Sequence, residues 1–236
     1  MPDWNDENSS LKKNIFLTIP KAASRTVGQY MEKYSEILHH DHWKTQYDIS
    51  IQSDLKNMPE FKDYFIYTFG RNPYKKIISC YECLYAEPLE VKEWEKEEIT
   101  REHFTFERFV NIITQEINPS YQRKPCWNIH WEPQTSFILN KDGKLQVDYV
   151  GNVETIIDDI DYICNEIGLN LTRTGPCCHK LSPDGKRPKW KVKSIGEPVG
   201  KTSWLHSDYK SYYTDDIKKK VAKYYERDIE FFKTTF

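Results

Sequence analysis

The six residues from Lys21 to Thr26, KAASRT, carry two cationic and two hydroxyl side chains directly after an apolar run. Cationic and hydroxyl donors around a tight turn are groups that bind phosphate or sulfate oxygens. If a helix begins there, its first backbone N–H groups and its dipole also favour an anion. The small Ala22 and Ala23 would let an oxyanion approach the backbone closely. The stretch predicts an anion site, although a capped helix with a solvated lysine explains it equally well.

A second basic stretch, RNPYKKIISCY, begins at Arg71 after another apolar run. Arg71 and Ser79 could grip one phosphate, the guanidinium as a two-pronged donor and the hydroxyl as a single donor. Taken alone, a surface arginine and a helical serine explain this pair better. Two such stretches in one chain, however, favour a ligand with two separated phosphates. The first turn does not match GxxxxGK[ST], which disfavours a Walker-type nucleoside triphosphatase.

The elements that would position these residues are strands alternating with helices. Continuous apolar runs predict buried strands at 14–19, 64–70 and 146–153. Helical periodicity predicts helices from Thr26 through Leu38, from Pro73 onward behind an Asn72 cap, over 104–118, over 155–167 before Gly168, and over 214–232. The alternation predicts an α/β fold of three layers, with a central parallel sheet covered on both faces. Because ligands of such sheets bind beyond the carboxyl ends of the strands, both basic stretches should lie at that edge.

Charge and hydropathy exclude several classes of protein. The formal net charge is −2, so broad electrostatic binding to nucleic acid is not expected. No apolar segment reaches the roughly 18 residues of a membrane span, and the polar start MPDWNDENSSLKK does not resemble a signal peptide. We therefore expect a cytoplasmic protein, with residues 1–13 as a flexible leader and residues 14–236 as one domain.

The sequence contains six cysteines: Cys80, Cys83, Cys126, Cys164, Cys177 and Cys178. Without a secretory signal, we expect reduced thiols rather than disulfides. The CxxC of Cys80 and Cys83 and the vicinal pair Cys177–Cys178 could together hold zinc. However, CxxC at helical spacing more often reflects packing.

Both basic stretches resemble motifs of sulfotransferases that use PAPS, 3′-phosphoadenosine 5′-phosphosulfate. PKAASRT is similar to their 5′-phosphosulfate loop, PKxxxxT/S. RNPYKKIISCY is similar to their 3′-phosphate motif, RxPxxRxxSxY, with Lys76 at the second arginine position. NIHWEPQ, VGNVETIIDD and the tail HSDYKSYY resemble the carbohydrate sulfotransferases, the group of chondroitin and HNK-1 enzymes and shorter bacterial relatives. The resemblance extends over residues 14–232.

The resemblance implies in-line transfer of a sulfuryl group from PAPS to an acceptor hydroxyl, with release of 3′,5′-ADP and no metal. It implies a P-loop-like strand–turn–helix that holds the phosphosulfate. The implied cofactor site consists of Lys21, Ala22, Ala23, Ser24, Arg25, Thr26, Arg71 and Ser79. Lys21 would neutralise charge on the leaving 5′-phosphate, and Arg71 and Ser79 would hold the 3′-phosphate. Arg25 and Asn152 depart from the family's usual residues at their positions.

A base must accept the proton of the acceptor hydroxyl, and histidine suits this role near neutral pH. The segment HHDHW contains His39, His40 and His42, and the resemblance favours His42, with His40 next. His130, in HWEPQ, is the other candidate, either as the base or as a residue that orients the acceptor. Glu132 and Glu154 are weaker options.

Three functions remain open at this point. The leading one is a sulfotransferase acting on a carbohydrate-type hydroxyl; the others are a nucleotide-dependent small-molecule kinase and a non-catalytic nucleotide- or carbohydrate-binding protein. The acceptor pocket is expected in segments 40–60, 84–103 and 172–203. The basic run 184–193 could guide an anionic acceptor or close over the adenine, although a solvated loop is the simpler explanation. Neither a nucleic-acid partner nor a membrane span is expected.

Overall fold

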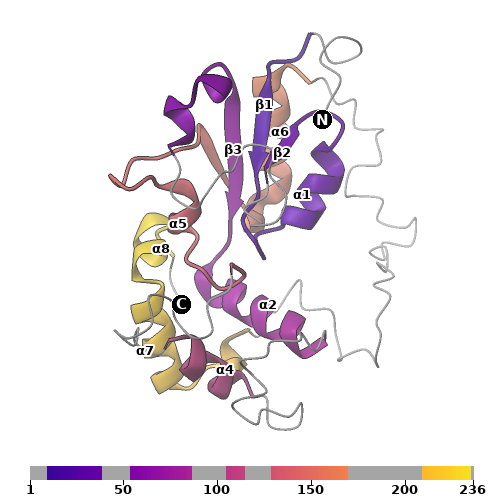
Figure 1. Cartoon of the computed structure of the whole chain (residues 1–236). Coiled ribbons are helices and arrows are strands. Elements are labelled where there is room, and N and C mark those ends of the chain that lie inside the picture. The colour runs from indigo at the N-terminus through magenta and orange to yellow at the C-terminus, as the bar shows by residue number, and fades with distance from the viewer. Residues whose placement is uncertain (1–9, 39–53, 87–104, 115–128, 170–208, 235–236) are drawn as a thin grey trace, which may run out of the picture. The chain divides into compact units, whose positions relative to one another are not determined.

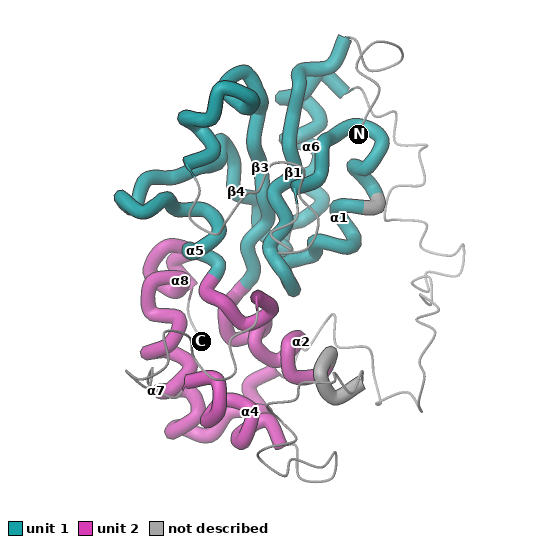
Figure 2. Tube along the Cα trace, in the orientation of Figure 1, with its two compact units in different colours: residues 1–71, 134–190 teal, residues 72–133, 191–236 magenta. Residues whose placement is uncertain are grey.

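The computed structural model describes residues 10–38, 54–86, 105–114, 129–169 and 209–234 (Figure 1). The chain divides into two compact units (Figure 2). Unit 1 comprises residues 1–71 and 134–190, and unit 2 comprises residues 72–133 and 191–236. The chain therefore leaves unit 1 after Arg71 and re-enters it at Gln134. That residues 14–236 form a single domain stays a prediction.

Unit 1 is built on a sheet of four parallel strands in the order β2-β1-β3-β4. The strands are β1 (Asn14–Leu17), β2 (Glu36–Leu38), β3 (Phe65–Gly70) and β4 (Tyr149–Asn152). In register, Ile15 of β1 pairs with Glu36 of β2 and with Ile66 of β3. The predicted α/β fold with a central parallel sheet is confirmed.

Alternate residues of the strands face two different cores. Phe16, Tyr67 and Phe69 pack with the helices α1 (Ser24–Met31) and α6 (Ile156–Ile167). Ile15, Leu17 and Ile66 pack on the other side, with Leu55, Phe61 and Val147. Leu55 and Phe61 come from two short 3₁₀ segments, η1 (Leu55–Asn57) and η2 (Pro59–Phe61). Because side chains alternate along a strand, a sheet covered on both faces requires the continuous apolar runs seen in the sequence.

The predicted helix from Thr26 through Leu38 is wrong in its second half. The helix α1 ends at Met31, whose carbonyl oxygen accepts hydrogen bonds from the N–H groups of both Tyr34 and Ser35, each at 2.8 Å. The buried Asn14 side chain then donates to the Tyr34 carbonyl oxygen at 2.9 Å. These contacts turn the chain back beside β1, so residues 36–38 form β2 instead.

Unit 2 is helical, with a largely aromatic core. Its helices are α2 (Pro73–Ala86), α4 (Phe106–Ile113), α7 (Asp215–Tyr224) and α8 (Glu226–Phe231), with a short 3₁₀ segment, η6 (Tyr209–Tyr212). The predicted start of α2 is confirmed, because the Asn72 side chain accepts a hydrogen bond from the Tyr74 N–H at 2.9 Å and Pro73 is the first helical residue. Within this unit, Trp131 is buried against Phe109.

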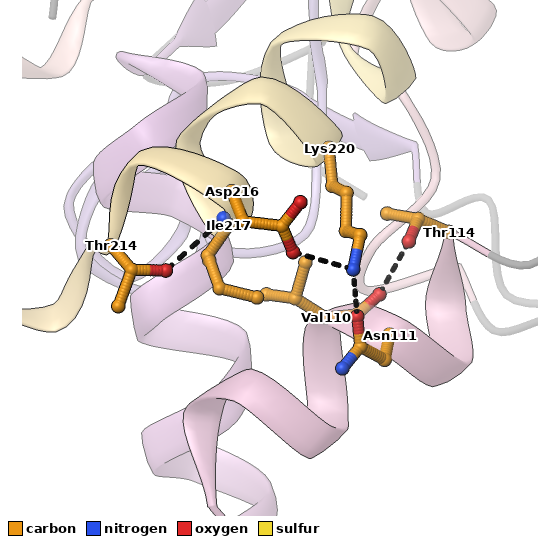
Figure 3. A network of polar contacts seen from close by, with 7 residues as sticks. All are labelled: Val110, Asn111, Thr114, Thr214, Asp216, Ile217 and Lys220. Carbon is orange, nitrogen blue, oxygen red and sulfur yellow. Dashed lines mark hydrogen bonds and ion pairs between the residues drawn. The ribbon is translucent and has the colours of Figure 1, made fainter.

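A polar network joins α4 to α7 (Figure 3). Lys220 on α7 donates to the Asn111 side chain on α4 at 2.8 Å and pairs with Asp216 one turn earlier at 2.7 Å. The helix α7 begins behind Thr214, whose hydroxyl oxygen accepts a hydrogen bond from the Ile217 N–H at 3.3 Å. The network fixes the start of α7 and its packing on α4 through groups that point toward one another.

Two other predicted helices differ in their bounds from the observed ones. The range 214–232 forms two helices, α7 and α8, which are separated at Tyr225. The helix α4 ends at Ile113, and the predicted continuation through 115–118 lies outside the described residues. The helix α6 ends at Ile167, directly before Gly168 as predicted, and Gly168 has a φ of 78°. No helix in the described part of the chain is long and apolar enough to span a membrane.

Candidate functional site

The turn between β1 and α1 holds two residues in the left-handed backbone region. Lys21 has a φ of 64° and Ala23 a φ of 58°. Lys233 is the one other non-glycine residue with a positive φ among the described residues. This conformation costs roughly 1–2 kcal/mol for an ordinary residue. Such backbone strain is concentrated at binding and active sites, so the turn is a strong candidate for function.

The start of α1 has no capping side chain. Ala23 is the N-cap residue, and its methyl side chain cannot accept the hydrogen bonds that a serine or an aspartate would. The first intrahelical bond runs from the Val27 N–H to the Ala23 carbonyl oxygen at 2.9 Å. The N–H groups of residues 24–26 therefore have no acceptor within the helix. Together with the helix dipole, they suit a bound phosphate or sulfate.

The side chains of this turn differ in their burial. Ala22 and Ala23 are buried, so their small methyl groups pack inward. Lys21, Ser24 and Thr26 are half-buried, whereas Arg25 is exposed. The Ala22 N–H is used within the turn, since it donates to the Ile19 carbonyl oxygen at 3.1 Å.

Arg71 brings the second basic stretch to the same place. It directly follows β3, which pairs with β1. Its side chain is 8 % exposed, and its Nη1 donates to the Lys21 carbonyl oxygen at 3.4 Å. In the order β2-β1-β3-β4, β2 lies on one side of β1 and β3 lies on the other. The carboxyl ends of β1 and β3 therefore form the switch point of the sheet. Open α/β sheets bind their ligands there.

Gln134 was not identified from the sequence, yet it contacts Arg71 twice. Its Oε1 accepts from the Arg71 N–H at 2.8 Å, and its Nε2 donates to the Arg71 carbonyl oxygen at 2.7 Å. The Gln134 side chain is fully buried. Its position in HWEPQ is the sequence feature that could have indicated a role, but the candidates that the sequence offers in this segment are His130 and Glu132 and not Gln134.

In unit 2, Lys76 and Cys80 hold the backbone of the HWEPQ segment. The Lys76 Nζ donates to the carbonyl oxygens of His130 and Glu132 at 2.8 and 2.9 Å. The Cys80 thiol donates to the same His130 oxygen at 2.9 Å. Lys76 is fully buried and lies 5.6 Å from the ring centroid of Tyr225. Lys76 therefore has a structural role, which explains why a cation belongs at this position of the motif.

The carbonyl oxygen of Trp131, which lies between His130 and Glu132 in the chain, is held as well. The Tyr225 hydroxyl donates to the Trp131 carbonyl oxygen at 2.6 Å. Burial raises the pKa of Tyr225 well above its usual range, so this hydroxyl stays protonated and acts as a donor. Trp131 is itself buried and is a core residue rather than a sugar-binding face. The carbonyl oxygens of His130, Trp131 and Glu132 are therefore all held by hydrogen bonds. The His130 residue is itself half-buried.

A carboxylate organises the turn after β4. The Asp159 Oδ2 accepts from the Asn152 N–H at 3.0 Å and from the Thr155 hydroxyl at 2.7 Å. Its Oδ1 accepts a short hydrogen bond from the Tyr149 hydroxyl. Asn152 caps the following residues by accepting from the Glu154 N–H at 2.9 Å. The VGNVETIIDD segment is thus a structural turn at the carboxyl end of the strand beside β3.

The remaining predicted residues lie elsewhere. Ser79 is a half-buried residue of α2 in unit 2. His40 and His42 lie outside the described residues, as do the segments 87–103 and 172–203. Cys80 and Cys164 are buried and are not joined in a disulfide; that the cysteines of the chain are reduced stays a prediction. Within the described ranges, no group of three or more histidine, cysteine or acidic side chains is placed to hold a metal ion.

Comparison with known proteins identifies a family. The family model described as the sulfotransferase family matches residues 10–234. No curated protein and no solved structure matches the chain. The family match includes both basic stretches and the HWEPQ segment, so the features described above all lie within it.

Proposed function

The chain belongs to the sulfotransferase family, and we propose that it transfers the sulfuryl group of PAPS to a hydroxyl of a carbohydrate-type acceptor. Transfer of a sulfuryl group follows from the family, whereas the donor and the acceptor class are our proposal. The observation that carries it is the contact between the guanidinium of Arg71 and the backbone of Lys21 at the switch point of the sheet. Two sets of cationic and hydrogen-bonding groups at one edge of the sheet suit a sulfuryl donor that carries two separate anionic groups.

The residues present fit PAPS. The N–H groups of residues 24–26, with Lys21, would hold the 5′-phosphosulfate, because the start of α1 has an N-cap residue without a capping side chain. Arg71 would grip the 3′-phosphate as a planar fork, and Ser79 would add a hydroxyl donor. The exposed Arg25 would add a cation at the mouth of the turn.

PAPS supplies the sulfuryl group and a phosphate leaving group. The protein's contribution is positioning and charge stabilisation, as in phosphoryl transfer. Lys21 would neutralise the charge that develops on the leaving oxygen, while the α1 N–H groups keep the donor aligned. His42 or His130 would accept the proton of the attacking hydroxyl. Within unit 2, the backbone carbonyl of His130 is held by Lys76 and Cys80.

Nucleotide binding tests the donor directly. The purified chain should bind 3′,5′-ADP at least about tenfold more tightly than 5′-ADP, the factor that 1.4 kcal/mol of phosphate contact provides. Isothermal titration calorimetry would measure both dissociation constants. Equal affinities would reject PAPS as the donor, and magnesium-dependent ATP turnover would favour a kinase.

Lys21 tests whether the site is catalytic. Lys21→Ala should lower sulfate transfer by about 10²–10³-fold, the typical loss when one preorganised stabilising group is removed. Lys62→Ala removes an exposed lysine elsewhere in unit 1 and is the matched control. Transfer from radiolabelled PAPS, with circular dichroism as the check on folding, gives the readout. Full activity of Lys21→Ala would contradict the assigned role.

The acceptor class has its own test. The same labelled donor should sulfate members of a panel of oligosaccharides in preference to lipids, phenols and small alcohols. Sulfation confined to the non-carbohydrate members would reject the acceptor class and leave the donor assignment intact.

A further inference from the structure

We propose that Gln134 is a positioning residue for the 3′-phosphate subsite, which it controls through the backbone of Arg71. The inference rests on the proposed function, because it assumes that Arg71 binds the 3′-phosphate. It assigns a role to the glutamine of HWEPQ that differs from a part in the acceptor site.

The contact between Gln134 and Arg71 reproduces the pairing of a neighbouring strand. The strand β3 ends at Gly70, one residue before Arg71. Directly beyond it, the Gln134 amide accepts from the Arg71 N–H and donates to the Arg71 carbonyl oxygen, at 2.8 and 2.7 Å. A primary amide offers the same acceptor and donor as a peptide group. Gln134 therefore extends the pairing of β3 by the one residue that carries the guanidinium.

Burial makes this contact difficult to replace. Gln134 is fully buried and Arg71 is nearly so. Buried backbone groups that lose their partners cannot turn to water, so the backbone would shift to satisfy them. The Gln134 carbonyl oxygen also accepts from the Phe137 N–H at 3.0 Å, at the start of the short helix α5 (Thr135–Ile138). The amide is thus attached to a fixed point within unit 1.

The orientation of Arg71 matters because a guanidinium recognises a phosphate by its geometry. Two parallel N–H donors must meet two oxygens, so an error in the backbone direction is carried to the end of the side chain. The Arg71 Nη1 contacts the carbonyl oxygen of Lys21 at 3.4 Å, which sets the guanidinium beside the anion-binding turn. Loss of Gln134 should therefore weaken recognition of the 3′-phosphate more than recognition of the 5′-phosphate.

The chain offers a matched control in Gln146. It is also a buried glutamine of unit 1, and its Nε2 donates to the Lys144 carbonyl oxygen at 3.1 Å. Its Oε1 accepts from the Lys56 N–H at 3.4 Å. The same amide-to-backbone bonds are therefore made at residues outside the proposed nucleotide site.

The test compares Gln134→Met, Gln134→Glu and Gln146→Met. Gln134→Met keeps the length and removes both bonds, whereas Gln134→Glu keeps the acceptor for the Arg71 N–H and loses the donor. Calorimetry would give the dissociation constants of 3′,5′-ADP and 5′-ADP for each folded variant. We expect Gln134→Met to weaken 3′,5′-ADP binding about tenfold, with a change of less than about twofold for 5′-ADP. Gln134→Glu should shift the ratio in the same direction, and Gln146→Met should leave it unchanged.

The outcomes separate this inference from the function on which it rests. If the wild-type protein does not distinguish the two nucleotides, the PAPS assignment fails and the inference fails with it. If the wild type distinguishes them and Gln134→Met keeps the wild-type ratio, the function stands and the role of Gln134 is rejected. An equal loss for both nucleotides would likewise reject it in favour of a merely structural role.

A measurement on the wild type does not depend on whether a variant folds. We expect 3′,5′-ADP to slow hydrogen exchange of the Arg71 amide more than 5′-ADP does at equal saturation, because the 3′-phosphate would lock the backbone that Gln134 holds. Equal protection by the two nucleotides would overturn the proposed coupling.

Discussion

Gly151 on β4 provides a sharp test of the packing between β3 and β4. A Cβ atom at this position would lie 2.7 and 2.9 Å from two ring carbons of Phe69 and 3.2 Å from the Asp159 Cβ. Phe69 is fully buried and packs edge-on against Phe16, with ring centroids 6.2 Å apart. The ring has little room to move, so Gly151→Ala must push the two strands apart or displace α6.

The expected cost follows from these contacts. Overpacking a core by one methyl group costs about 1–3 kcal/mol. Replacing a glycine also removes freedom from the unfolded chain, which returns about 0.4–1 kcal/mol. We therefore expect Gly151→Ala to lower the free energy of unfolding by about 1–2 kcal/mol. Urea titration followed by far-UV circular dichroism would measure it, with unchanged m-values as the sign of unchanged native and unfolded states.

Gly28 supplies the matched control. It lies inside α1, and among the described residues a Cβ there would meet only the Ile37 Cδ1 at 3.7 Å, an ordinary van der Waals contact. Gly28→Ala should raise the free energy of unfolding by about 0.5–1 kcal/mol, because alanine favours the helix. If Gly151→Ala were as stable as the wild type while Gly28→Ala behaved as expected, the close approach of β4 to Phe69 would be refuted.

Two further predictions concern unit 2. Thr214→Ala should lower the free energy of unfolding by about 1 kcal/mol through loss of the α7 cap, and Thr214→Ser should retain most of the stability; equal urea midpoints for all three proteins would contradict the cap. Burial, and next the negative charge of Glu82, raise the pKa of Tyr212 to about 12 from its usual 10. Since the folded state holds this proton more tightly, its contribution to stability is complete below pH 10 and is lost as the pH rises toward 12. Absorbance at about 295 nm would follow tyrosine ionisation in the wild type and in Tyr212→Phe; loss of the tyrosinate signal near pH 10 in the variant would show an unperturbed Tyr212.

Sequence reasoning succeeded where the cause of a structure is local. The apolar runs identified β1 and β3, and the Asn72–Pro73 pair marked the start of α2. It failed after Met31, because Tyr34, Ile37 and Leu38 have helical spacing in the sequence, although residues 36–38 form a strand. The hydrogen bond from Asn14 that helps to turn the chain joins residues 20 positions apart, and no local pattern reports it.

The candidate site divides in the same way. The sequence by itself determined that Lys21 and Arg71 each follow a buried strand and have cationic and hydroxyl residues as chain neighbours, because residue type and local order are enough for that. The tertiary structure decided that these strands are neighbours and that the two residues touch. It also decided the part played by Gln134, whose amide pairs with a backbone 63 positions away. A side chain that pairs with a distant backbone group produces no recognisable pattern in the sequence, because only the fold decides which peptide group it meets.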